Sequence, residues 1–473
     1  MIRALADLHL VPVPGDLVTN GLAVAVVALL HVQVAAYLQG AAALSTISQG
    51  IALMRPDPRH ERFAHGLVTS MAYVFGFGAA LAIFWVIWIL TVLWGHAWVD
   101  LSIVTFWPLV FEAGAFLSEI VLLYAIYAGW DRLSAYPRAR FGMLVLLTVA
   151  MWLQMDFIDV VASYMLTPNH GDTNQLAQVL NPTSLPLQLH RTVGNIAWAG
   201  AAIAFYAGFS YLRATRRQRR RREPELAGAR SVGAMAATEF AGTPPSDAAA
   251  RRGYLDWVGQ WGVLWAVMMS LFQIWIGYSY AKEIQLHTYS AWFRMMRGIL
   301  SNVFLAQIFL LGLIFVLGSL YFWQRMRASG VSRLWVQRLC FVGLVLATLL
   351  AVQPAWFAVD EADVIAAHLD RPWWDGGLLN PIGDFIPWKV FALIALMVLG
   401  LTSATSYVRA YSEGRVRIGE TTRRLQVVLL ALGMTVSVMM MVMGVIRENG
   451  RQPYLIHGEL TIQHQQVVTG PGP

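Results

Sequence analysis

A small set of ionisable side chains lies inside long apolar stretches of the sequence. The set comprises His31, Glu112, Glu119, Asp156, Asp159, His190 and Glu448. Ionisable groups are costly in lipid, so each of them is a candidate for function. Imidazole and carboxylate groups can ligate a heme iron, and a buried carboxylate can take up and pass on a proton.

The composition predicts that these stretches cross a membrane. Of the 473 residues, 57% are apolar and 13% are charged, whereas a soluble domain has about 25% charged residues. The one cysteine, Cys340, excludes a disulfide framework and a C-x-x-C-H heme attachment. We expect no nucleic-acid partner for the net charge of +7, because the placement of the arginines fits membrane topology.

Ten apolar stretches are long enough to cross a bilayer, which takes about 20 helical residues. Because lipid cannot satisfy backbone polar groups, we expect an all-α transmembrane helix bundle of about ten spans. Proline-containing breaks separate the stretches, as at Arg55-Pro56-Asp57-Pro58. The stretches run over 18–53, 63–95, 103–129, 138–166, 186–213, 256–285, 298–323, 334–358, 386–409 and 424–446.

The arginines predict the topology. With the N-terminus outside the membrane, the inner segments contain 25 of the 34 Lys and Arg residues, as the positive-inside rule requires. Both termini are therefore expected outside. The inner segments are 54–62, 130–140, 213–252, 325–338 and 409–424.

One long polar segment divides the chain into three parts. We expect helices 1–5 in residues 1–213, a basic cytoplasmic linker in 214–253, and helices 6–10 with an outer tail in 254–473. Six of the seven residues from Arg216 to Arg222 are arginine. They either bind anionic lipid head groups or form a charge block that stops translocation, followed by a flexible linker.

This topology brings three of the candidates to the outer side of the bundle. His31 lies in the outer half or middle of the first helix, and His190 and Glu448 lie at the outer ends of the fifth and tenth. A lone membrane histidine is often satisfied by a backbone or hydroxyl group. Two imidazoles and a carboxylate on one side, among many aromatic residues, favour heme ligation instead.

Three short motifs accompany these residues. Glu448 is followed by Gly450-Arg451-Gln452-Pro453-Tyr454, Gly129-Trp130-Asp131-Arg132-Leu133 closes the third helix, and Leu180-Asn181-Pro182 precedes His190. Together they resemble the large, heme-bearing subunit of the cytochrome bd oxidase family, whose signature E-x-G-R-Q-P-W the first motif follows. The resemblance covers about 18–213, the sixth helix and about 385–458, and it implies a location in the bacterial plasma membrane.

The resemblance implies iron ligands. His31 matches the ligand of an active-site heme, Glu448 matches the ligand of the high-spin heme b, and His190 matches one ligand of the low-spin heme b. Two or three hemes are therefore expected. They are hemes b, with heme d as an alternative at one site.

The resemblance also implies residues around the hemes. Glu112 and Glu119 are similar to two third-helix glutamates of the heme site and its proton path, with one fewer residue between them here. Arg451 resembles an arginine beside the heme propionates, where a guanidinium can pair bidentately with a carboxylate.

The low-spin heme site departs from the family. Where the family has Arg-x-Met, this chain has Lys389-Val390-Phe391. Lysine can still meet a propionate, but phenylalanine cannot ligate iron. The low-spin heme is therefore five-coordinate, ligated differently (Met397 lies deeper in the same helix), or absent.

The quinol site departs as well. The family has a lysine and a glutamate after the sixth helix, whereas 291–297 has neither at the aligned positions, and two extra helices, 298–323 and 334–358, follow. The outer loop 359–385 is acidic. We therefore expect the electron donor to be a basic c-type cytochrome or a partner heme subunit at the outer face rather than quinol.

Asp156 and Asp159 are a third departure, since the family keeps this segment apolar or neutral. The two residues are three apart and so lie on one helix face. Two interpretations are open. The pair forms a proton relay or shares a proton, or it lines a polar groove that bonds to a partner subunit.

The function expected from these residues is that of a heme-binding subunit of a bd-type oxidase-like respiratory complex, an oxidoreductase. Electrons would pass from an outer donor to oxygen at a heme pair, with a second membrane subunit of the bd type or a paralogous heme subunit as partner. The alternative is a heme-b electron-transfer or structural subunit of a larger respiratory complex, without oxygen reduction. A non-redox scaffold or transporter is the third interpretation.

Overall fold

The computed structural model describes residues 17–55, 57–84, 95–169, 181–229, 247–296, 298–352, 387–419 and 421–461. Nearly all of these residues are helical. The helices are α2 (Leu17–Met54), α3 (Pro58–Ile83), α4 (Gly95–Val104), α5 (Phe106–Leu133), α6 (Pro137–Leu166), α8 (Ser184–Ala229), α9 (Asp247–His287), α10 (Tyr289–Met296), α11 (Ser301–Ala328), α12 (Trp335–Ala351), α14 (Pro387–Ser412) and α15 (Arg423–Gly450). A two-stranded antiparallel hairpin follows, with β1 (Tyr454–Ile456) and β2 (Leu460–Thr461).

Nine helices in the described part of the chain are long and apolar enough to cross a membrane. They match nine of the ten predicted stretches in order. The remaining stretch, 334–358, contains α12, an apolar helix of 17 residues. The prediction of an all-α, multi-pass membrane bundle is therefore confirmed, while the side on which the termini lie stays a prediction. The acidic loop 359–385 and residues 230–246 of the basic linker lie outside the described residues.

Local sequence sets several helix ends. Asp57 caps α3 by accepting a hydrogen bond from the Arg59 backbone N–H at 2.9 Å, and Pro58 follows at the first helical position. The Arg59 side chain also pairs with this carboxylate and holds the pKa of Asp57 below its usual value. Gly330 and Gly414 have φ values of 77° and 72° just after α11 and α14, a backbone conformation that favours glycine at helix ends.

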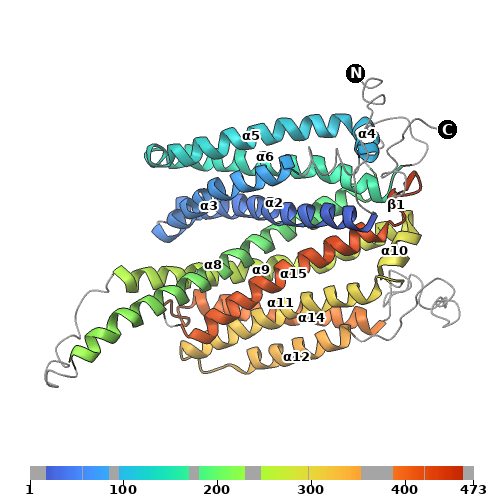
Figure 1. Ribbon diagram of the computed structural model, residues 1–473. Helices are drawn as coiled ribbons and strands as arrows, with labels where there is room; N and C mark the ends of the chain where they lie inside the picture. The colour runs from blue at the N-terminus through green and yellow to red at the C-terminus, as the bar shows by residue number, and fades with distance from the viewer. Residues whose placement is uncertain are drawn as a thin grey trace, which may run out of the picture.

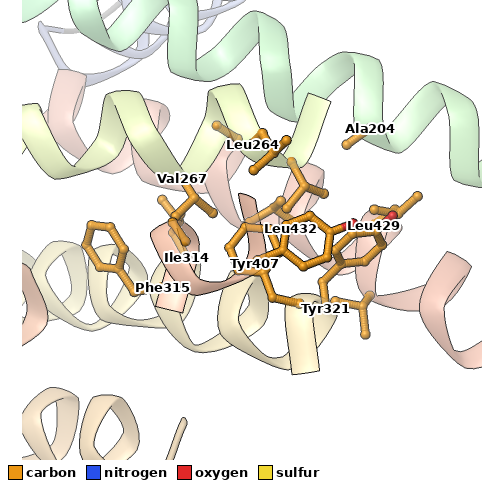
Figure 2. Packing of buried hydrophobic residues seen from close by; sticks show 14 of the residues in the cluster. Ala204, Leu264, Val267, Ile314, Phe315, Tyr321, Tyr407, Leu429 and Leu432 are labelled. Carbon is orange, nitrogen blue, oxygen red and sulfur yellow. The ribbon is translucent and has the colours of Figure 1, made fainter. Parts of the chain in front are cut away.

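Helices α8 and α9 form a seam that joins two hydrophobic clusters. One cluster combines them with α2, α3, α5 and α6, and the other combines them with α11, α12, α14 and α15. In Figure 1, α5 and α6 lie at one side of the bundle and α12 at the other. Figure 2 shows the second cluster, where Tyr321 and Tyr407 lie beside Leu429 and Leu432.

Two glycines let α8 and α9 approach closely. A Cβ atom on Gly200 would lie 2.8 Å from the carbonyl oxygen of Gly262, and one on Gly262 would lie 2.6 Å from that of Gly200. Small residues at such crossings are the usual means of packing helices in lipid, where no hydrophobic force drives helices together. A larger residue at either position would push the seam apart.

A buried ion pair fastens the connection between α14 and α15. Arg325 Nη1 and Nη2 donate to the two carboxylate oxygens of Asp256 at 2.8 and 2.5 Å, and both side chains have 0% exposure. The backbone N–H of Gly419 donates to the same carboxylate at 2.7 Å, and Arg325 also donates to the carbonyl of Arg417 at 2.8 Å. The pair therefore links α9, α11 and the loop before α15.

Helices α4 and α10 and the hairpin gather at one end of the bundle, which is the predicted outer end (Figure 1). The His457 backbone N–H donates to the carbonyl of Met165 at 3.0 Å, and the Tyr164 hydroxyl donates to Glu459 at 3.0 Å. The chain after Glu448 is thus held against the end of α6.

Candidate functional site

A cavity of about 2120 Å³ opens inside this end of the bundle. Typical small-molecule sites measure about 300–1,000 Å³, so the cavity has room for more than one such ligand. Its lining comes from both halves of the bundle and is mostly apolar. Seven of the sequence candidates line it, namely His31, Glu112, Glu119, Asp159, His190, Glu448 and Arg451.

Two other candidates are not part of that lining. Asp156 is half-buried on α6, where its backbone carbonyl accepts a hydrogen bond from Gln188 at 3.4 Å. Lys389 is buried near the start of α14, and its neighbour Val390 faces the cavity instead. Asp156 and Asp159 therefore have different surroundings, although they lie one turn apart on α6.

Three residues of α9 lie next to His190. Gly277 lies opposite the imidazole, and a Cβ atom there would be 3.5 Å from the ring, in ordinary contact. Gln273 Nε2 donates to the backbone carbonyl of His190 at 2.8 Å. The ring of Tyr280 lies 6.1 Å from the imidazole. α9 thus contacts both the backbone and the ring of His190, and the imidazole also borders the cavity.

Glu448 lies between two arginines at the end of α15. Arg447 Nη1 donates to one carboxylate oxygen at 2.7 Å, and Arg451 Nη2 lies 2.5 Å from the other. Arg451 is buried, and Arg447 also donates to the carbonyl of Ala162 on α6 at 2.5 Å. The Glu448 side chain keeps 46% exposure because it borders the cavity.

A second ion pair lies nearby, between Arg191 and Asp159. The Asp159 side chain has 0% exposure and accepts a hydrogen bond from Arg191. Three guanidinium groups, those of Arg191, Arg447 and Arg451, therefore share two carboxylates at the cavity. This surplus of positive charge suits an anionic ligand. Arg191 and Arg447 were not predicted from the sequence, although each is adjacent to a predicted ligand.

Glu112 and Glu119 lie on α5, and both line the cavity. Gln154 Nε2, from α6, donates to Glu112 at 3.0 Å. Glu119 is buried with 3% exposure. Their separation of seven residues places them on one face of α5, about 10 Å apart along the axis.

A model of a known protein family matches the N-terminal part of the chain. Residues 21–250 match the family model described as cytochrome bd terminal oxidase subunit I. This part of the chain is therefore similar to that family. The matched region contains His31, Glu112, Glu119 and His190, and so confirms the resemblance for α2 to α8.

Two further comparisons concern solved structures and curated proteins. Among solved structures, the bd oxidase from Geobacillus thermodenitrificans matches with 13% sequence identity and a TM-score of 0.46, covering 92% of this chain and 98% of that chain. A search of the curated proteins finds no match.

Beyond the part matched to the cytochrome bd family, α14 presents one face to the cavity. Val390, Leu393, Ile394 and Met397 line it at helical spacing, whereas Phe391 has 50% exposure and is not among the lining residues. Phe391 therefore neither has a ligating atom nor borders the cavity. Thioether sulfurs are nevertheless available there, because Met397 and three methionines of α15 line the cavity, namely Met439, Met440 and Met443.

Proposed function

We propose that this chain is the heme-binding subunit of a bd-type respiratory oxidase complex that passes electrons from an outer donor to oxygen. The observation that supports this proposal most is the shared cavity. Residues far apart in sequence, His31, His190 and Glu448, border one large apolar space next to surplus arginines. The match of 21–250 to the cytochrome bd family model points to the same role.

The residues present fit hemes. His31 and Glu448 would ligate the iron of the active-site hemes, and His190 would ligate a low-spin heme b. When Glu448 turns to iron, Arg447 and Arg451 need other anions, and heme propionates suit a guanidinium. Bound heme would supply one-electron redox chemistry and an open iron position for oxygen, tuned by its ligands and by the dry surround.

The protein supplies protons through α5 in this proposal. Glu119 takes up a proton from the cytoplasmic side and Glu112 holds one at the cavity, where Gln154 orients its carboxylate. The two carboxylates are about 10 Å apart, too far for direct transfer, so water must lie between them. On the predicted topology Glu112 is the nearer of the two to the outer face.

The second ligand of the low-spin heme stays open among three alternatives. Met397 ligation agrees with the lining of the cavity, since Met397 and His190 both border it. A five-coordinate heme needs no partner for His190. Absence of this heme would leave that part of the cavity to another group. Lys389 would meet a propionate only after turning toward the cavity.

The donor in this proposal binds at the outer face and is not quinol. The segment that aligns with the family's quinol residues lies in α10, where Ala291, Trp292, Phe293 and Met295 are buried in an apolar cluster. We propose a c-type cytochrome or a partner heme subunit as donor, and a second membrane subunit of the bd type or a paralogous heme subunit as the stable partner. The complex would lie in the bacterial plasma membrane, with the N-terminus outside.

One other function deserves a test, that of an electron-transfer subunit without oxygen reduction. The substitution of Phe391 at the usual methionine position favours it. The complex, purified with its partners, should consume oxygen when a reduced c-type cytochrome is added and should not respond to quinol. Oxygen consumption with quinol would contradict the proposed donor. A heme-containing complex that consumes no oxygen with either donor would favour electron transfer alone.

A further inference from the structure

The inner half of α2 contains several polar side chains that are almost completely buried. Gln39, Ser45, Ser48 and Gln49 have between 0 and 4% exposure. They lie in a helix that is apolar enough to cross the membrane. Polar groups at membrane depth are costly and tend to line pathways or water-filled spaces. The function proposed above gives these residues no role.

Hydroxyl groups continue the polar surface from α2 to α6. The hydroxyl oxygens of Thr46 and Thr148 are 2.8 Å apart, and both groups bond to the carbonyl of Leu144. One turn further along α6, Gln39 Nε2 donates to the carbonyl of Met151 at 3.0 Å. Successive turns of α6 thus present polar atoms to α2.

We call the side chains of Gln39, Thr46, Gln49, Thr148 and Asn195 the polar column. Its Gln39 end reaches the cavity. Asn195 Nδ2, from α8, donates to Gln39 Oε1 and to the sulfur of Met155, the latter at 3.1 Å. Gln39, Met155 and Asn195 all line the cavity.

The Gln49 end of the polar column lies toward the arginine-rich end of the bundle. Gln49 Oε1 is buried and has no hydrogen-bond partner within the described residues. One residue earlier, the Ser48 hydroxyl lies 3.3 Å from Nδ1 of His60, a half-buried side chain in the first turn of α3. A titratable group, His60, therefore lies near this end of α2, where Gln49 has a buried oxygen without a partner among the described residues.

We propose that the side chains of Gln49, Thr46, Thr148, Gln39 and Asn195 form a second proton route, from the His60 end of the bundle to the cavity. Hydroxyl groups can donate and accept at once, so the Thr46–Thr148 pair can relay a proton in either direction. Gln39 and Gln49 are ten residues apart, about 15 Å along α2, so bound water must fill the intervals.

This inference rests on the proposed oxygen reduction, which consumes one proton for each electron delivered. A second route would explain why an enzyme of this kind tolerates a shortened Glu112–Glu119 spacing, because the α5 path would not act alone. The competing interpretation is that these residues only hold helices together, as hydroxyl and amide groups do in many membrane bundles. That interpretation predicts that substitutions lower the stability of the protein without changing the rate of proton uptake.

The test compares substitutions at Thr148. Thr148→Val removes the hydroxyl and keeps the shape, whereas Thr148→Ser keeps the hydroxyl. The control is Thr435→Val on α15, because the buried Thr435 hydroxyl donates only within its own helix, to Ala431 at 2.8 Å. Each complex, purified with its partner subunits and fully reduced, is mixed with oxygen in weakly buffered solution, and a pH-indicator dye reports the rate of proton uptake.

We expect Thr148→Val in a Glu119→Gln background to slow proton uptake about tenfold relative to Glu119→Gln alone, with an unchanged heme spectrum. Thr148→Ser and Thr435→Val in that background should match Glu119→Gln. If Thr148→Val fails to assemble, Thr46→Val removes the other hydroxyl of the pair and should give the same result.

Equal uptake rates in the Val and Ser variants would overturn the second route and leave the proposed function intact. A Glu119→Gln complex that takes up no protons at all would also overturn it, because the column would then conduct nothing. A wild-type complex that contains heme but reduces no oxygen would instead overturn the proposed function, and with it the need for this route.

Discussion

The buried pair of Asp256 and Arg325 gives the sharpest prediction about stability. Asp256→Ala would remove the acceptor of three hydrogen bonds, two from Arg325 and one from the Gly419 backbone. Both side chains have 0% exposure, so water cannot replace the lost partner. Leaving one charge of a buried pair uncompensated typically costs about 3–5 kcal/mol.

A loss of that size should lower the unfolding temperature by roughly 10 °C, taking about 2–4 °C per kcal/mol for a protein of larger size. The assay is thermal unfolding of the purified protein in detergent, with all variants heated at one scan rate because unfolding is often irreversible. Glu413→Ala is the matched control. Glu413 pairs with Arg409 at 2.9 Å in the same connection between α14 and α15, but this pair is exposed, and we expect no measurable change.

The double variant Asp256→Leu/Arg325→Met separates the charge effect from general damage. Two apolar side chains in place of the pair should recover much of the lost stability, because neither charge is then left buried. An unfolding temperature for Asp256→Ala within about 2 °C of wild type would refute the reasoning. A double variant as unstable as Asp256→Ala would show that packing, and not the uncompensated arginine, causes the loss.

Three further predictions concern the cavity. His31→Ala and Glu448→Ala should each remove a heme or a high-spin spectral component, and full heme content with an unchanged spectrum in both variants would contradict the assigned ligands. Glu112→Gln should lower the rate of steady-state oxygen consumption about 100-fold while heme content stays intact, and Glu119→Gln should lower this rate less. Wild-type rates in Glu112→Gln would exclude a role of Glu112 in proton transfer. Because Phe391 replaces the usual methionine, we expect a six-coordinate His–Met heme only if Met397 supplies the sulfur, and a His–Met low-spin signal that is lost in His190→Ala but kept in Met397→Leu would disprove this expectation.

Most of the fold could be predicted from the sequence, because lipid leaves the backbone little choice. Apolar stretches of sufficient length identified the nine helices long enough to span a membrane in the described part of the chain, and prolines and Asp57 marked some of their limits. The packing could not be predicted. Nothing in the pattern of single stretches shows that α8 and α9 cross through Gly200 and Gly262, since that depends on residues in two separate helices.

The candidate site could be predicted in part, because a charge in an apolar stretch stands out. The cavity gathers His31, His190 and Glu448 as expected. Arg191 and Arg447 were missed because arginines near helix ends are common for topological reasons, and only the fold shows that these two point inward to pair with carboxylates. Polar uncharged residues such as Gln39 and Thr148 were missed because their sequence positions do not reveal which helix faces meet.

The reduced-minus-oxidised optical spectrum of the purified complex, recorded with and without carbon monoxide, shows directly whether this chain binds heme at His31 and Glu448. We expect heme b bands, with or without heme d, and a high-spin component that shifts when carbon monoxide binds, because His31 and Glu448 would each leave an iron position open. The part of the high-spin component that depends on Glu448 should be lost in the Glu448→Ala variant, and the part that depends on His31 should remain. A wild-type spectrum without any heme band would contradict the account altogether.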